Sequence, residues 1–184
     1  MTTAPAVPPF LRLDHGGTCL VLDLRRGGAR LVHLGAPLPE SENLAALALA
    51  SSRWRHESQP DHPPLPSLLP QAGQGGMATA AVRCLRSSQE CETSFSLVTA
   101  SQQANGLQLQ FADAFAGIQV ELRWQLHDTG MVSSHCRLTN TGTTPLTVVR
   151  LASLALPLPG QFTQVVRFPG RWAAEMREER VPLA

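Results

Sequence analysis

The amino-acid sequence predicts an all-β fold, an antiparallel β-sandwich. Several segments alternate apolar and polar residues with a period of two, and turns that contain glycine or asparagine separate them. No apolar stripe with the helical period continues for more than two turns. These two observations favour two packed sheets over a closed barrel.

The clearest predicted strand covers residues 118–126. Its apolar side chains fall at every second position and are expected to face the core together: Ile118, Val120, Leu122, Trp124 and Leu126. The other predicted strands cover residues 18–24, 29–34, 81–85, 93–97, 107–111, 132–138 and 146–156. Residues 25–28 are predicted to join the first two of these in a hairpin, and turns are expected at His127-Asp128 and at residues 140–142.

Two segments are less regular. Between residues 146 and 156 the apolar positions change from even to odd and back to even, which predicts one or two β-bulges between Val148 and Leu154. Leu44–Ala50 is a run of Ala and Leu that fits either a helical turn or a strand.

Residues 51–76 are rich in Pro, Ser, Gln and Gly and predict a long irregular loop. Proline removes the donors that a strand needs, and glycine weakens local order. A loop of this length inside a compact domain is usually functional or disordered.

The composition excludes several classes of function. The chain has 184 residues and a net charge of +1, so bulk electrostatics indicate neither nucleic acid nor an anionic membrane as a partner. All 15 basic residues are arginine, so a Schiff-base lysine and a phosphate-loop lysine are excluded. The N-terminus does not read as a signal peptide and no segment reaches the length of a membrane span, so we expect a cytoplasmic protein.

The sequence predicts no metal or cofactor site. The cysteines at positions 19, 84, 91 and 136 show no metal-ligand spacing and are expected to be free thiols in a reducing compartment. The six histidines are dispersed, and neither a nucleophile elbow nor a phosphate loop is present. Most of the carboxylates, Glu121 on a polar strand face among them, are interpreted as solvated surface groups.

Trp172 is the candidate ligand-binding residue. It follows Pro169-Gly170, which predicts a turn out of the sheet, and it lies outside the alternating pattern among charged residues. A tryptophan in this position suits stacking on the apolar face of a sugar, with Arg171, Glu175 and Arg177 near enough in sequence to bind hydroxyl groups. Packing of Trp172 against another part of the sandwich remains the alternative.

A family resemblance rests on elements that occur in a fixed order. They are residues 106–113 (GLQLQFAD), 117–124 (GIQVELRW), 137–142 (RLTNTG) and 151–153 (LAS), then Gly170-Arg171-Trp172-Ala173-Ala174-Glu175 and Arg180. Together they resemble the amino-terminal β-sandwich domain of family 36 glycoside hydrolases, the bacterial α-galactosidases. The similarity covers the second half of the chain well and the first third loosely.

The resemblance implies a retaining hydrolase of terminal α-D-galactosides whose two catalytic aspartates lie in a barrel that follows the sandwich. We therefore expect residues 1–184 to be a partial amino-terminal domain, incomplete at its C-terminal end, and inactive alone, with no catalytic residue assigned. It implies roles as scaffold and in homo-oligomerisation, and it places Trp172 beside the galactose site, often that of a neighbouring subunit.

The sequence departs from the family pattern in the long loop. Ser or Arg53 stands where the family has an acidic residue, and residues 75–80 (GGMATA) lack the two charges expected there. Contact between this loop and the sugar is therefore in question. Two other functions remain open: a stand-alone, lectin-like carbohydrate-binding module, and a structural domain in which Trp172 anchors an interface.

Overall fold

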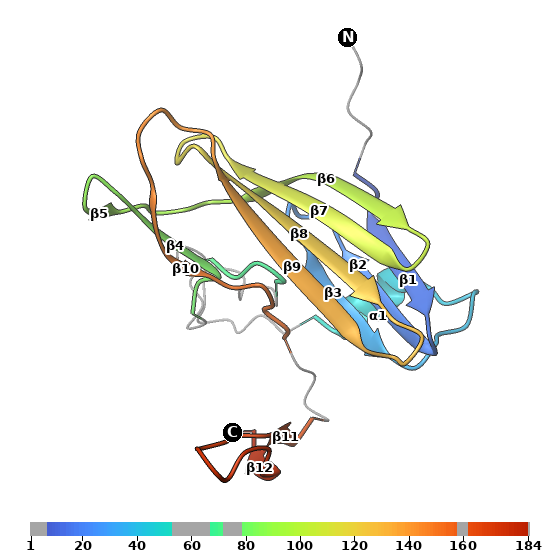
Figure 1. Ribbon diagram of the computed structural model, residues 1–184. Coiled ribbons are helices and arrows are strands. Elements are labelled where there is room, and N and C mark those ends of the chain that lie inside the picture. The colour runs from blue at the N-terminus through green and yellow to red at the C-terminus, as the bar shows by residue number, and fades with distance from the viewer. Residues whose placement is uncertain (1–6, 53–66, 72–78, 158–161, 184) are drawn as a thin grey trace, which may run out of the picture.

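The computed structural model describes residues 7–52, 67–71, 79–157 and 162–183. These residues form an antiparallel β-sandwich with one short helix, α1 (Leu44–Ala50) (Figure 1). The predicted fold class is therefore confirmed.

The strands form four sheets. The first contains β1 (Phe10–His15), β2 (Thr18–Asp23) and β3 (Arg30–Gly35), and the second has the order β10 (Thr147–Leu151), β4 (Val82–Arg86) and β5 (Gln89–Glu90). The third is a meander of β6 (Ser96–Gln103), β7 (Gly106–Asp113), β8 (Ile118–Leu126) and β9 (Val132–Asn140). The fourth is the hairpin of β11 (Gln164–Arg167) and β12 (Glu179–Pro182).

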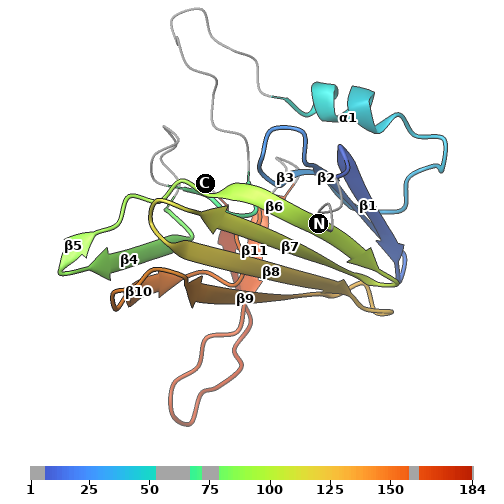
Figure 2. The ribbon, with the colours of Figure 1, turned by 90° about the horizontal axis from the view of Figure 1, so that it is seen from above.

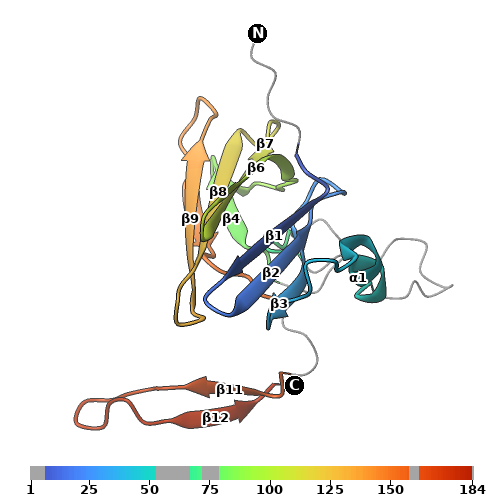
Figure 3. The same cartoon turned by 90° about the vertical axis from the view of Figure 1, so that its right-hand side faces the viewer.

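The four-stranded sheet is one layer of the sandwich, and the sheet of β1, β2 and β3 faces it (Figures 2 and 3). A single cluster of buried side chains draws on both layers and on β4, for example Leu20, Val82 and Leu109. The five side chains predicted to face inward from β8 are all buried, and the most exposed of them, Trp124, shows only 3% of its surface. Alternation alone was sufficient to orient this strand.

Helix α1 resolves the ambiguity of the Ala and Leu run. Asn43 caps its N-terminus, because its side-chain oxygen accepts hydrogen bonds from the amide nitrogens of Ala45 (3.1 Å) and Ala46 (3.0 Å). The end of the helix is held by the buried Arg30, which donates from Nη2 to the carbonyl oxygen of Ala48 (2.7 Å). The helix lies beside the sheet of β1, β2 and β3 (Figure 3).

The predicted strand at 93–97 is correct only for its last two residues, because strand β6 begins at Ser96 and continues to Gln103. Two side chains take the place of a neighbouring strand there. The Asp113 carboxylate accepts from the amide of Ser94 (2.7 Å), and Gln71 Oε1 accepts from the amide of Phe95 (2.6 Å). These groups satisfy the backbone without a ladder.

The hairpin of residues 18–34 is confirmed, since β2 pairs antiparallel with β3. Strand β1, which was not predicted, pairs with the other edge of β2. The predicted turns at His127-Asp128 and at residues 140–142 are also present. A register shift between Val148 and Arg150 confirms a β-bulge in the predicted region, but the strand ends at Leu151 and not at residue 156.

The predicted turn at Pro169-Gly170 is wrong in detail. Strands β11 and β12 were not predicted. Strand β11 ends at Arg167, and the chain then passes through the long loop of the β11–β12 hairpin, residues 168–178. The tight turn lies at Trp172-Ala173, closed by pairing of Arg171 with Ala174.

The predicted irregular loop 51–76 lies mostly outside the described residues. Of its described part, Ser51 and Ser52 follow α1, and Ser67 forms an isolated bridge with Arg30. Leu68 and Leu69 are buried in the core cluster, so the chain returns to the sandwich here.

Candidate functional site

The candidate site is the loop between β11 and β12, residues 168–178. The amide of Ala174 donates to the carbonyl oxygen of Arg171 (2.8 Å), and the amide of Arg177 donates to that of Pro169 (3.3 Å). Ala173 and Met176 have positive φ values of 62° and 57°, which is unusual for residues other than glycine. The backbone thus folds back twice within the loop and defines its shape.

Trp172 projects from the tight turn of this loop. Its surface is 92% exposed, and Phe168 and Met176 of the same loop are exposed too. Soluble domains rarely expose three large apolar side chains on a single loop. An exposed apolar group of this kind generally marks an interaction site. Phe168 and Met176 were not predicted as part of the site, and nothing in their local pattern distinguished them from core residues.

The charged residues of the hairpin divide into two groups. Arg167 and Glu179 pair across the strands, from Nε to Oε2 at 2.8 Å, and Arg180 pairs with Glu178, from Nε to Oε1 at 2.7 Å. The Arg167 guanidinium holds the pKa of Glu179 below its ordinary value by hydrogen bonding to it. The other group is Arg171, Glu175 and Arg177, all exposed and without an ion pair to any described residue.

The arrangement offers the components of a sugar-binding surface. An exposed indole face can stack on the apolar face of a pyranose ring, and two arginines and one glutamate supply donors and an acceptor for hydroxyl groups. The loop has no pair of carboxylates held across a pocket, and no nucleophile next to a general base.

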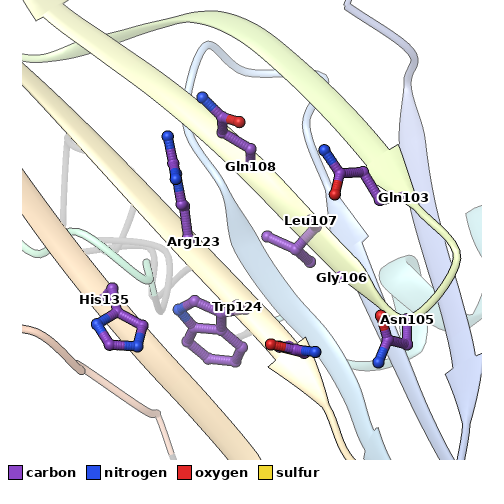
Figure 4. Close-up of a pocket in the computed structure, with 9 residues that line it drawn as sticks. Gln103, Asn105, Gly106, Leu107, Gln108, Arg123, Trp124 and His135 are labelled. Carbon is purple, nitrogen blue, oxygen red and sulfur yellow. The ribbon is translucent and has the colours of Figure 1, made fainter.

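A second surface lies on the outer face of the four-stranded sheet. It is a hollow of ≈ 450 Å³ where β7 begins and β8 ends, lined among others by Asn105, Gln108, Arg123 and His135 (Figure 4). Glu121, on the same face of the sheet, accepts from Gln108 Nε2 (2.6 Å), and its Oε1 forms an ion pair with Arg123 Nε (2.7 Å). Its carboxylate is therefore engaged within the sheet face and is less solvated than the sequence indicated.

The remaining acidic candidates have structural partners. Asp113 is buried and accepts from the amides of Ser94 and Ala116, which fixes the start of β6 and the β7–β8 turn. Asp128 Oδ1 lies 2.8 Å from His15 Nε2 and joins two turns. Within the described ranges, no three His, Cys, Asp or Glu side chains gather in a way that could hold a metal ion.

No helix in the described part of the chain combines the length and the apolar character that a membrane span requires.

Comparison with known proteins identifies the family. The model of the glycosyl hydrolase family 36 N-terminal domain matches residues 27–184. The chain therefore belongs to this family, as the ordered motifs of its second half indicated. A comparison with curated proteins finds no significant match.

Solved structures support the same fold. Variants of the α-galactosidase AgaA from Geobacillus stearothermophilus, in complexes with 1-deoxygalactonojirimycin and with raffinose, superpose with a TM-score of 0.79 at 20% identity, over 95% of this chain and 28% of theirs. AgaB from the same organism gives a TM-score of 0.76 at 20% identity, over 99% and 29%. The α-galactosidase from Lactobacillus brevis gives 0.73 at 20% identity, over 95% and 27%. The chain thus spans little more than a quarter of these enzymes.

Proposed function

We propose that this chain is the amino-terminal domain of an enzyme that hydrolyses terminal α-D-galactosides with retention of configuration. In this proposal residues 1–184 form a non-catalytic scaffold, take part in homo-oligomerisation, and border the sugar site with Trp172. The observation that carries the proposal is the exposed Trp172 on a shaped loop of a family 36 domain.

The β11–β12 hairpin supports a role in assembly. A two-stranded hairpin is marginally stable alone in water, because neither face is covered. All residues of β11 are exposed, and of β12 only Val181 is partly covered. A surface on a second subunit, or on the catalytic barrel, would cover Val165 and Val166 and fix the orientation of the loop that carries Trp172.

The likeness of the fold to structures bound to 1-deoxygalactonojirimycin and raffinose supports galactosides as the substrate class. Trp172 would contribute stacking, worth about 0.5–1.5 kcal/mol, and the barrel would contribute the two carboxylates. We place the protein in the cytoplasm, with no cofactor.

A stand-alone carbohydrate-binding module is the second candidate. The exposure of Trp172 favours this candidate, because the indole is accessible to a sugar without any further domain. The two candidates differ in the affinity that they predict between the isolated chain and a sugar. One tryptophan without the rest of a pocket buries too little area for appreciable affinity, whereas a lectin-like module saturates with its ligand.

The test is a titration of the chain with raffinose, followed by the indole N–H signals in two-dimensional NMR. Trp172→Ala identifies the Trp172 signal, and Trp124, buried in the core, is the internal control. Our proposal predicts no saturation at millimolar raffinose. Saturable shifts confined to the Trp172 signal would overturn it in favour of the stand-alone module.

A further inference from the structure

Cys84 and Cys91 lie directly opposite each other in the β4–β5 hairpin. The pairing of Arg86 with Gln89 and of Leu85 with Glu90 continues to Cys84 and Cys91, and the amide of Cys91 donates to the carbonyl oxygen of Cys84 at 2.9 Å. The hairpin projects at one end of the sandwich (Figures 1 and 2). The two cysteines, seven residues apart in the sequence, are therefore cross-strand neighbours in the structure.

The register depends on a two-residue turn. Ser87 and Ser88 both have positive φ values, 51° and 65°, which is the geometry of the tight turn that matches the twist of a hairpin. Opposite residues in an antiparallel pair project their side chains from the same face. Accordingly, Cys84 is buried in the core cluster and the half-buried Cys91 packs against that cluster.

The spacing of such a pair is close to that of a disulfide. Opposite residues have Cβ atoms about 4.5–5.5 Å apart, with hydrogen-bonded pairs such as Cys84 and Cys91 at the wide end, and a disulfide requires about 3.5–4.5 Å. A movement of about 1–2 Å just beyond the end of a two-residue strand closes the difference. Cys91 directly follows the short, fully exposed strand β5 and is only partly buried, so it can make that movement while Cys84 keeps its place in the core.

We propose that Cys84 and Cys91 are a modification site: a thiol pair that a low-molecular-weight disulfide such as oxidised glutathione converts reversibly to an intramolecular disulfide. The Cys91 thiolate attacks one sulfur of glutathione disulfide, and one glutathione thiolate leaves. The Cys84 thiolate then attacks the Cys91 sulfur and releases the second glutathione. The two cysteines lose two protons and two electrons, and glutathione disulfide is reduced to two thiols.

The roles follow from burial. Cys91 is partly accessible and meets the oxidant first, whereas burial raises the pKa of the Cys84 thiol and makes it the resolving partner. The bond forms across a hydrogen-bonded pair and needs the strands to approach, so it is strained and readily reduced. Cys19 is fully buried in the sheet of β1, β2 and β3, and burial raises the pKa of Cys136 to about 11, so both stay reduced.

The experiment exposes the folded chain to glutathione buffers of increasing oxidised fraction, blocks free thiols with an alkylating reagent in acid, and digests with trypsin. The chain contains no lysine, so cleavage after Arg83, Arg86 and Arg123 separates the two cysteines into residues 84–86 and 87–123. We expect the intact mass to fall by two hydrogen atoms and these two peptides to be linked. Reduced glutathione in excess should restore both thiols.

Single-site variants control the assignment. Cys84→Ala should convert the disulfide to a glutathione adduct on Cys91, whereas Cys19→Ala and Cys136→Ala should leave the linked peptide unchanged. The wild-type digest is decisive even where a variant folds poorly. A folded chain that keeps four thiols, carries only glutathione adducts, or links a different pair of cysteines would overturn the proposal.

Discussion

Arg86 donates from Nη2 to the side-chain oxygen of Asn140 at 3.1 Å, and so joins strand β4 to the turn that follows β9. The same nitrogen donates to the carbonyl oxygen of Ala116 (2.9 Å), and Nη1 donates to the hydroxyl and carbonyl oxygens of Thr144. One guanidinium therefore holds two turns of the sandwich in place beside the β4–β5 hairpin.

Replacement of Arg86 by Met should lower the free energy of unfolding by about 1.5–3 kcal/mol, because several hydrogen bonds to a charged group are lost and the carbonyl oxygen of Ala116 loses the donor that the structure gives it. Arg83→Met, in the same strand, is the matched control. Among the described residues Arg83 pairs only with the exposed Glu90, so its loss should cost less than about 1 kcal/mol. Urea unfolding measures both, and equal losses would contradict the assigned role of Arg86.

Two adjacent glycines in the β1–β2 turn should respond differently to alanine. Both have positive φ, 56° at Gly16 and 72° at Gly17, so each substitution should cost about 1–2 kcal/mol in backbone strain. At Gly16 the new Cβ would also meet the carbonyl oxygen of His127 and lie 2.9 Å from Cα of Asp128, whereas at Gly17 it would meet no atom within 4 Å. Gly16→Ala should therefore cost about 1–3 kcal/mol more, by urea unfolding. A greater loss at Gly17 would argue against the contact between the two turns.

Asp23 should make stability depend on pH. Burial alone raises the pKa of this carboxyl, but the hydrogen bonds from Arg25, from Nε at 2.9 Å and from the amide at 3.1 Å, outweigh burial and hold the pKa below its ordinary value. The stabilisation is thus fully present above the unfolded pKa of about 3.9 and is lost as the pH falls through the lower folded value. Melting temperatures of the wild type and Asp23→Asn should differ at neutral pH and converge in acid. A difference that persists unchanged to about pH 2 would refute this assignment.

The fold was predictable where local pattern and tertiary environment agree. In β8 every second residue is apolar, and one face of the sheet is exposed to solvent. The inward orientation of Trp124 could therefore be predicted from the sequence. The start of β6 was not predictable, because the backbone of Ser94 and Phe95 bonds to side chains from elsewhere in the chain. The β11–β12 hairpin was missed because it has no buried face and therefore no alternation to detect.

The candidate site was predictable in part. Trp172 stood out because it interrupts a series of strands, and the structure finds it exposed. The tight turn that presents it could not be located, because Ala173 adopts a positive φ without the glycine that usually signals one. The cross-strand pairing of Cys84 with Cys91 could not be predicted for a similar reason. The turn that sets it, Ser87-Ser88, is not a typical hairpin sequence.

The chain alone should not hydrolyse an α-galactoside. A retaining mechanism needs a nucleophile and an acid/base carboxyl about 5–5.5 Å apart, and in the proposed function both belong to the catalytic barrel and not to this domain. The measurement is release of a chromogenic phenol from an aryl α-galactoside by protein freed of host enzyme. Turnover that copurifies with the folded chain and survives further chromatography would contradict the scaffold role.

The most direct test of the central claim is the steady-state kinetics of Trp172→Ala in an enzyme that carries this domain ahead of its catalytic barrel. Phe115→Ala is the matched control, because Phe115 is an equally exposed aromatic residue at the β7–β8 turn. We predict that Trp172→Ala lowers kcat/KM for raffinose by about 2- to 10-fold, with a melting temperature close to that of the wild type, and that Phe115→Ala changes neither. An unchanged kcat/KM together with a large loss of stability would show that Trp172 packs at an interface and does not border the sugar.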